Sequence, residues 1–195
     1  MRVLVVYAHP NPRSFCHAVR SQFIDGLHDA GHESEIIDLY AEGFDPTFRM
    51  NDYAFFARDD LPADVIRTMG LRQRVEDMAG GTIRRWLATR MLRDKSEGDI
   101  IKLIGKHKPT DVLAHQEKIA RADGLAIVAP VFWMGFPAIL KGWIDRVFSY
   151  GFAYKLTEEG WKGDIKGRVP LLRHEKALVM MTTFFTRDHY GCLLY

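Results

Sequence analysis

The sequence has few cysteines, little net charge and no long apolar run. Its two cysteines, Cys16 and Cys192, are too few for a disulfide framework and lack the spacing of a metal site. The net charge of +2 gives no reason to expect binding to nucleic acid or to an anionic membrane. No apolar run approaches the roughly 20 residues needed to span a bilayer. We therefore expect a cytoplasmic protein with no membrane insertion, no nucleic-acid partner and no metal.

Several chemical signatures are also missing. The sequence has no Gly-x-Gly-x-x-Gly segment, which argues against a dinucleotide-type Rossmann site, and no Gly-x-Ser-x-Gly segment to support hydrolase chemistry. His17, His28 and His32 have no acidic or cysteine partner at ligand spacing. Residues 1–8 form an apolar run too short for a secretory signal and are expected to form the first strand.

The pattern that is present indicates an α/β protein. At 195 residues, 47% of them hydrophobic, the chain fits one domain over residues 1–195. Apolar, β-branched runs predict buried parallel strands, and four-residue repeats of apolar side chains predict helices. The expected strands are 3–8, 33–39, 126–130 and 176–182, and the expected helices include 15–29 and 138–147. Alternating strands and helices are typical of a parallel sheet covered on both faces.

A long helical insertion is expected between the second and third strands, over about residues 57–111. Apolar side chains recur at helical spacing over residues 63–92, with an interruption at Gly80-Gly81. Arginines give this region a basic cast. A solvated helix face is the simplest interpretation; contact with the extra phosphate of NADPH or with an acidic partner is the alternative.

The turn after the first strand has the residues of an anion site. Ser14 is placed to cap the helix that begins at Phe15, so backbone N–H groups and the positive helix end converge there. His9, Arg13 and the Ser14 hydroxyl add donors or positive charge. Taken alone, a capped helix after a proline turn explains this segment equally well.

An aromatic loop follows the third strand, where open α/β sheets bind ligands. It contains Phe132, Trp133, Met134 and Phe136. Exposing such side chains is costly unless something flat and apolar covers them, and a planar redox ring would do so.

Residues 130–148 closely resemble the flavin-contacting segment of the NAD(P)H:quinone oxidoreductases of the DT-diaphorase type. Residues 38–46, Asp-Leu-Tyr-Ala-Glu-Gly-Phe-Asp-Pro, match the segment that follows strand two in that family. The resemblance covers about residues 1–56 and 112–190. It implies a flavodoxin-like, doubly wound parallel sheet of order 2-1-3-4-5, in which we expect the fifth strand to be absent here.

The resemblance also implies which residues form the site. Those expected to bind the cofactor are His9, Arg13, Ser14, Phe15, Cys16, Pro130, Val131, Phe132, Trp133, Met134, Thr182 and Thr183. Tyr190 falls at the spacing of the family's active-site tyrosine, and His189 is placed to assist proton transfer. The chain departs from the family at Phe184-Phe185, where two glycines normally let the backbone approach the flavin.

The implied activity is two-electron, ping-pong transfer of a hydride from NADH or NADPH, through FAD or alternatively FMN, to a quinone or similar flat acceptor. FAD is favoured because the most similar segments belong to FAD enzymes, and a homodimer is implied because a second subunit completes the family's site. Two alternatives remain: a regulatory flavoprotein subunit of a potassium-efflux-type system, and a degenerate relative without flavin.

Overall fold

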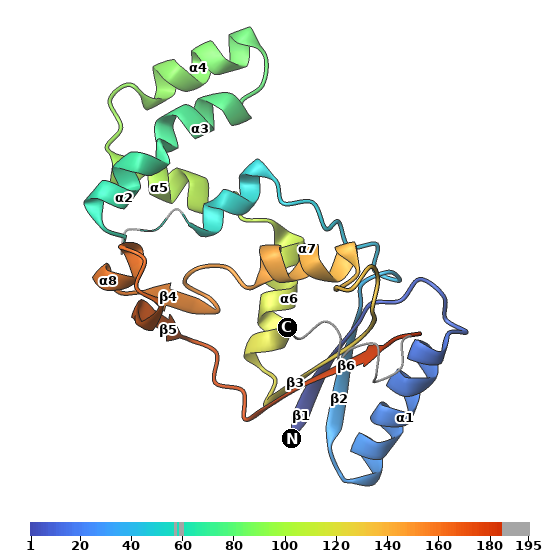
Figure 1. Ribbon diagram of the computed structural model, residues 1–195. Coiled ribbons are helices and arrows are strands. Elements are labelled where there is room, and N and C mark those ends of the chain that lie inside the picture. The colour runs from blue at the N-terminus through green and yellow to red at the C-terminus, as the bar shows by residue number, and fades with distance from the viewer. Residues whose placement is uncertain (57, 59–60, 185–195) are drawn as a thin grey trace. The chain divides into compact units, whose positions relative to one another are not determined.

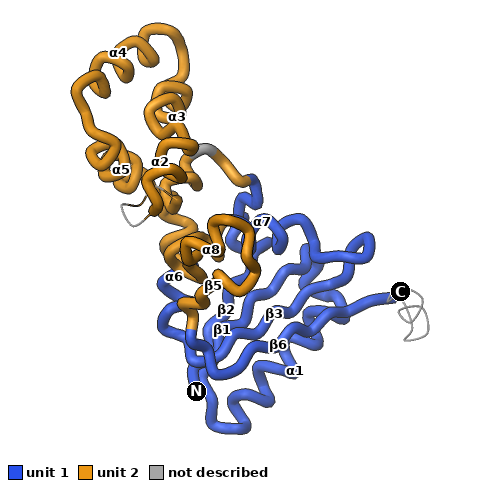
Figure 2. The backbone as a smooth tube through the Cα atoms, turned by 60° about the vertical axis from the view of Figure 1, so that its left-hand side comes forward, with its two compact units in different colours: residues 1–47, 115–145, 173–195 blue, residues 48–114, 146–172 orange. Residues whose placement is uncertain are grey.

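The computed structural model describes residues 1–56, 58 and 61–184, and the chain divides into two compact units (Figure 2). Unit 1 comprises residues 1–47, 115–145 and 173–195, and unit 2 comprises residues 48–114 and 146–172. Each unit thus combines separate stretches of sequence, and each is described by itself. That the whole chain acts as one domain stays a prediction.

Unit 1 is built on a parallel sheet of order β2-β1-β3-β6. Its strands are β1 (Arg2–Tyr7), β2 (Glu33–Asp38), β3 (Gly124–Pro130) and β6 (Lys176–Thr182). The register pairs Tyr7 with Asp38 and with Val128, and Pro130 with Thr182, so the carboxyl ends of all four strands meet at one edge. The parallel α/β sheet expected from the alternating pattern is confirmed, and its strand order agrees with the flavodoxin-like sheet that the resemblance implies. Within residues 1–184, β6 is an edge strand of this sheet.

Helix α1 (Phe15–Asp29) covers one face of the sheet (Figure 1). Ser14 caps its first turn, and Gly31 follows its end with φ 75°, a conformation that glycine adopts without strain. Val19 and Phe23 of α1 pack on Val3, Val5 and other side chains of β1, β3 and β6. The apolar four-residue repeat of the sequence thus forms the buried stripe of this helix.

Helices α6 (Thr110–Ala120) and α7 (Ala138–Val147) lie on the opposite side of the sheet from α1 (Figures 1 and 2). Trp143 of α7 is fully buried, and its indole N–H donates to Nδ1 of His115 at 3.0 Å. Nε2 of His115 lies 2.8 Å from a carboxylate oxygen of Glu42, in the segment after β2. Because Nδ1 accepts, the ring proton belongs on Nε2, and the three side chains tie α6, α7 and that segment together.

Gly142 shows why a glycine stands in the middle of α7. A Cβ added there would lie 2.1 Å from the carbonyl oxygen of Pro46 and 2.6 Å from its Cα. The backbone of the segment after β2 therefore passes directly over the helix. This contact gives the Phe44-Asp45-Pro46 sequence a structural role.

Unit 2 contains most of the helical insertion. Its helices are the 3-10 helix η1 (Met50–Phe55), then α2 (Ala63–Met69), α3 (Leu71–Met78), α4 (Thr82–Leu92) and α5 (Glu97–Gly105). Buried side chains from η1, α3, α4 and α5, among them Leu71, Leu92 and Ile104, form its core. The expected interruption of the helical run at Gly80-Gly81 is confirmed. A second interruption occurs at Gly70, which adopts a left-handed conformation between α2 and α3.

A buried ion-pair network also stabilises unit 2. Nε of Arg146 donates to Asp52 at 3.0 Å, and its two terminal nitrogens donate to Asp111 at 2.7 and 3.2 Å. Arg146 is 5% exposed and Asp52 is fully buried. Burial opposes the charged guanidinium, but the bonds to Asp111 and Asp52 outweigh it and hold the pKa of Arg146 above its usual value.

Unit 2 also contains elements that the sequence did not predict. Strands β4 (Tyr154–Leu156) and β5 (Arg168–Pro170) form a small antiparallel sheet, with α8 (Glu158–Trp161) and the 3-10 helix η2 (Ile165–Gly167) between them. Three-residue strands are too short to show an alternating pattern.

Candidate functional site

The turn between β1 and α1 presents an ordered set of hydrogen-bond donors. Nδ1 of His9 lies 3.0 Å from the backbone nitrogen of Asn11 and 3.2 Å from its carbonyl oxygen, so the ring is held against the turn. The Asn11 side chain accepts from the N–H of Arg13 at 2.9 Å, and the Ser14 hydroxyl accepts from the N–H of His17 at 3.1 Å. These bonds hold the turn in place, and they leave Nε2 of His9 and the Ser14 O–H available to a ligand.

The start of α1 adds backbone donors to this turn. The first N–H groups of a helix have no partner within it. Across the described residues, the N–H groups of Phe15 and Cys16 accordingly have no acceptor, and Phe15 is 76% exposed. Two backbone N–H groups, a hydroxyl and the positive helix end therefore converge on one place, which is the arrangement that binds phosphate.

A buried polar cluster lies beneath this turn, and the sequence did not point to it. Tyr7 is 1% exposed, and its hydroxyl has no hydrogen-bond partner among the described residues. The Arg20 guanidinium lies 4.5 Å from the centre of the Tyr7 ring, and one of its nitrogens lies 3.4 Å from a carboxylate oxygen of Asp38. The only signal in the sequence was a tyrosine at the carboxyl end of an otherwise aliphatic strand.

Burial favours the neutral forms of Tyr7, at the end of β1, and of Cys16, in the first turn of α1. Burial raises the pKa of the Tyr7 hydroxyl, and the nearby Ser14 hydroxyl only partly offsets this effect. Burial also raises the pKa of the Cys16 thiol, against the opposing influence of Thr182 and Arg20. Cys16 is therefore a packing residue under the turn rather than a nucleophile.

The loop after β3 is closed by a tight turn. Phe132 and Gly135 exchange two backbone hydrogen bonds of 3.0 Å. Between them, Trp133 and Met134 have φ values of 50° and 66°, both left-handed. Such turns favour asparagine and glycine, so large side chains here are strained, and strain of this kind is typical of functional sites.

This turn holds its side chains out from the protein surface. Trp133 is 100% exposed, Met134 is 50% exposed, and Phe132 and Phe136 are each about 40% exposed. Four large apolar side chains in one short loop make an unusually apolar surface. Such a surface can cover one side of a flat, apolar ligand.

The loops after β1, β3 and β6 converge at the carboxyl edge of the sheet. The rings of His9 and Phe132 lie 6.4 Å apart, and the N–H of Val131 donates to the carbonyl of Thr182 at 2.8 Å. The Thr182 side chain also lies near Cys16 at the start of α1 and partly offsets the effect of burial, which raises the pKa of the Cys16 thiol. The structure thus brings together expected residues from all three loops. Among them, Pro130 is buried at the end of β3, whereas Arg13 and Thr183 are exposed.

The end of the third loop is only partly described. Phe184, which takes the place of a family glycine, is fully exposed. Tyr190 and His189, our candidate catalytic residues, and Phe185 lie outside the described residues.

No three His, Cys, Asp or Glu side chains within residues 1–56, 58 and 61–184 are grouped so as to hold a metal ion. Over the same residues, no helix combines the length and apolar character needed to cross a membrane.

The parallel sheet and its three loops define an α/β protein whose candidate ligand site lies at the carboxyl edge of the strands. Residues 1–191 match the protein family described as having a flavodoxin-like fold. The chain belongs to this family.

The chain is also similar to individual proteins that are named as dehydrogenases. The chain is 29% identical over 193 residues to a ribosyldihydronicotinamide dehydrogenase-like protein of Penicillium crustosum, covering 98% of this chain and 60% of that protein. It is 28% identical to an NAD(P)H dehydrogenase [quinone] 1 of Cavia porcellus, over 97% of this chain and 56% of that protein. The chain therefore spans less than two thirds of the length of these curated relatives.

A solved structure is similar to this chain in both fold and sequence. An NAD(P)H:quinone oxidoreductase from Methanothermobacter marburgensis superposes with a TM-score of 0.61 at 27% sequence identity. The match covers 99% of this chain and 69% of that protein.

Proposed function

We propose that this protein is a flavin-dependent NAD(P)H:quinone oxidoreductase that transfers two electrons to a quinone or a similar flat acceptor. The observation that carries the proposal is the juxtaposition of a phosphate-type turn with a strained, exposed aromatic turn at one edge of a parallel sheet. Relatives named as quinone and ribosyldihydronicotinamide dehydrogenases support the same activity.

The residues of the site fit a flavin in chemistry. Its phosphate would bind the Ser14 hydroxyl, the backbone N–H groups of Phe15 and Cys16, and the His9 ring, with the charge of exposed Arg13 nearby. The unpartnered Tyr7 hydroxyl supplies a polar group beneath the same turn. FAD stays favoured over FMN on the resemblance alone.

The ring would lie against the loop after β3. Backbone groups of residues 131–134 and the Trp133 side chain would hold it, with Thr182 and Thr183 at the neighbouring strand end. A bound flavin would supply the ability to accept a hydride from NADH or NADPH and to pass two electrons to the acceptor.

The residues of this chain would position the flavin ring, exclude water from it and stabilise the charge that develops on it. The turn at Trp133-Met134 is closed by its own hydrogen bonds, so it holds its backbone N–H groups in place before any ligand arrives. The exposed apolar side chains of this loop would leave little room for water beside the reacting ring. Tyr190, assisted by His189, stays our candidate for holding or relaying a proton.

Three further expectations belong to this proposal. The nicotinamide donor would leave before the quinone acceptor binds at the same position, which is a ping-pong mechanism. A homodimer is expected because a second subunit completes the site in the family that the sequence resembles. A cytoplasmic location is expected from the cysteine content.

Initial rates test the proposed activity. With flavin present, NADH or NADPH as donor and a soluble benzoquinone as acceptor, double-reciprocal plots at several acceptor concentrations should give parallel lines. Bound flavin without turnover would favour the regulatory alternative. Failure to bind flavin, in a folded protein, would favour the degenerate alternative.

A further inference from the structure

We propose that α4 of the helical insertion docks on the surface of anionic lipid membranes. The proposal does not rest on the flavin site, because the residues that carry it all belong to α3 and α4 of unit 2. It concerns attachment to a surface and not passage through the bilayer.

The face of α4 that does not pack on the rest of unit 2 is apolar. Ile83 is 75% exposed, Trp86 60%, Leu87 47% and Met91 65%. At 100° per residue these four side chains span an arc of about 140° on the helix. Leu92, which is 1% exposed, lies on the opposite side and belongs to the core of unit 2.

The charges on α4 are all of one sign. Residues 82–93 contain four arginines and no aspartate or glutamate. On the helix, Arg84 and Arg93 flank the apolar arc, while Arg90 lies within it and its guanidinium is 5.7 Å from the centre of the Trp86 ring. Arg85 pairs with Asp77 of α3 at 3.3 Å. Within the described residues Arg84 and Arg93 form no ion pair, so positive charge borders the apolar face.

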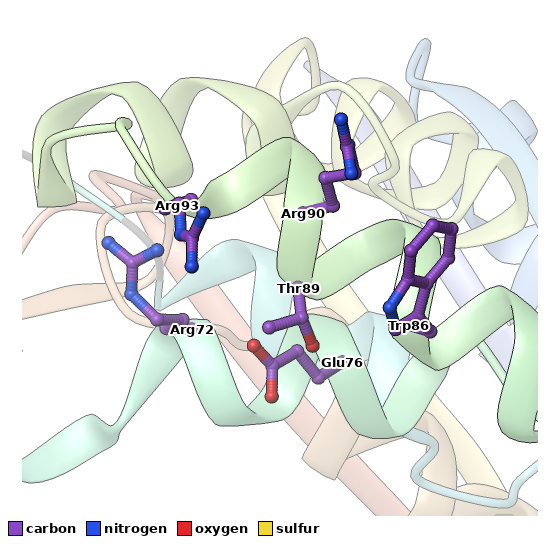
Figure 3. Close-up of a pocket in the computed structure, with 6 residues that line it drawn as sticks. All are labelled: Arg72, Glu76, Trp86, Thr89, Arg90 and Arg93. Atoms are coloured by element: carbon purple, nitrogen blue, oxygen red, sulfur yellow. The ribbon is translucent and has the colours of Figure 1, made fainter.

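A pocket beside this face adds further positive charge. It has a volume of about 430 Å³ and is lined by Arg72 and Glu76 of α3 and by Trp86, Thr89, Arg90 and Arg93 at the end of α4. Figure 3 shows Arg72 and Arg93 at one end of the pocket and Trp86 at the other, with Trp86 and Arg90 on successive turns of α4. Three arginines against one glutamate favour an anionic occupant such as a lipid phosphate.

These features together favour a lipid surface over other occupants. Although α4 as a whole is only weakly amphipathic, its exposed face combines apolar side chains, among them a tryptophan, with arginines on its borders, as in helices that lie in the membrane interface. Trp86 suits the boundary between headgroups and acyl chains, and arginine side chains can extend from it toward phosphates. A second copy of α4 would place arginines against arginines, and nucleic acid offers nothing to cover the apolar arc.

Co-sedimentation of the purified protein with vesicles tests the proposal. The protein should bind phosphatidylcholine vesicles that contain about 30% phosphatidylserine and should not bind pure phosphatidylcholine vesicles. Arg84→Gln with Arg93→Gln should lower the partition coefficient about 30-fold. Equal binding to both vesicle types, or to neither, would overturn the proposal.

Matched control variants separate docking at α4 from general adhesion. Ile83→Gln should weaken binding about 10-fold, while Ile165→Gln, whose side chain is equally exposed at 76%, should not. Lys162→Gln with Lys166→Gln removes two exposed positive charges elsewhere in unit 2 and should leave binding close to that of the parent. If both isoleucine variants bind alike, the apolar face of α4 is not the docking surface.

A competition experiment distinguishes the lipid from an acidic protein partner. Soluble poly-glutamate should compete only weakly with vesicles, because it offers nothing to the apolar arc. In addition, Trp86→Phe should abolish most of the blue shift in tryptophan fluorescence that accompanies vesicle binding. Tight poly-glutamate binding that Ile83→Gln leaves unchanged would overturn the proposal in favour of an acidic partner.

Discussion

Phe132 and Gly135 exchange two backbone hydrogen bonds of 3.0 Å and so close the turn on which Trp133 and Met134 stand. Both central residues are left-handed without being glycine. A left-handed conformation costs an ordinary residue about 1–2 kcal/mol. The fold therefore holds the backbone of Trp133 in a strained turn, with its indole ring exposed, at a cost in stability, which is expected where the ring has a ligand to cover.

Trp133→Ala should separate ligand binding from stability. Because Trp133 is fully exposed, the free energy of unfolding should change by less than about 0.5 kcal/mol. Flavin affinity should fall about 10-fold, since one aromatic stacking contact contributes about 1–1.5 kcal/mol. Quenching of flavin fluorescence during titration measures the affinity. Trp86→Ala, which removes an exposed tryptophan from unit 2, is the control and should bind flavin normally.

Gly142→Ala should destabilise the protein although alanine is the better helix former. The added Cβ would collide with the backbone of Pro46, so α7 or the segment after β2 must move. Forcing a side chain into a filled space costs about 1–3 kcal/mol. Urea unfolding measures this loss. Gly26→Ala in α1, where nothing lies within 4 Å of the added Cβ, should instead stabilise the protein by about 0.5–1 kcal/mol.

Arg146→Met should be among the most damaging single substitutions in unit 2. It leaves the fully buried Asp52 without its guanidinium partner, and breaking a buried pair in this way costs about 3–5 kcal/mol. Lys141→Met breaks the exposed Lys141–Asp145 pair of the same helix and should cost less than about 1 kcal/mol. Equal losses in thermal or urea unfolding would show that burial does not set the difference.

Glu35→Gln should change how stability depends on acid pH. The hydrogen bonds from Arg121, at 2.5 and 3.1 Å, lower the pKa of Glu35 below its usual value. A carboxylate with a lowered pKa stabilises the fold above the pKa of the unfolded chain, about 4.3 for glutamate, and this contribution is lost as pH falls through the folded-state pKa. The unfolding free energy of the parent should therefore exceed that of the variant near neutral pH, and this difference should disappear below about pH 4. A difference in unfolding free energy that stays constant from pH 7 to about pH 3 would contradict this assignment.

Much of the sheet and its covering helices could be predicted from the sequence. The bounds of α1, α7 and β6 agree with the expected residues 15–29, 138–147 and 176–182. These elements carry strong local signals: Ser14 before and Gly31 after α1, Pro137 before α7, and an apolar run in β6. Strand β1 extends over Arg2–Tyr7 rather than residues 3–8, a difference of one residue at each end.

Other features depend on tertiary contacts that no local pattern shows. The sequence did predict exposed aromatic side chains after β3, but not their left-handed turn, because Trp-Met is not a typical pair for it. Helix α5 lies within the expected helical insertion, but its bounds were not predicted although Ser96 and Asp99 form a capping box at its start. The Tyr7–Arg20–Asp38 cluster appears only when the register of β1 and β2 brings these residues together.

The absorbance spectrum of the purified protein, incubated with FAD or FMN and freed of excess flavin by gel filtration, tests the central claim most directly. We predict a yellow protein that retains the paired near-ultraviolet and blue bands of flavin, and that bleaches when NADH or NADPH is added without oxygen. A folded but colourless protein that retains neither flavin would contradict the account, because the three loops at the sheet edge would then have no flavin to bind.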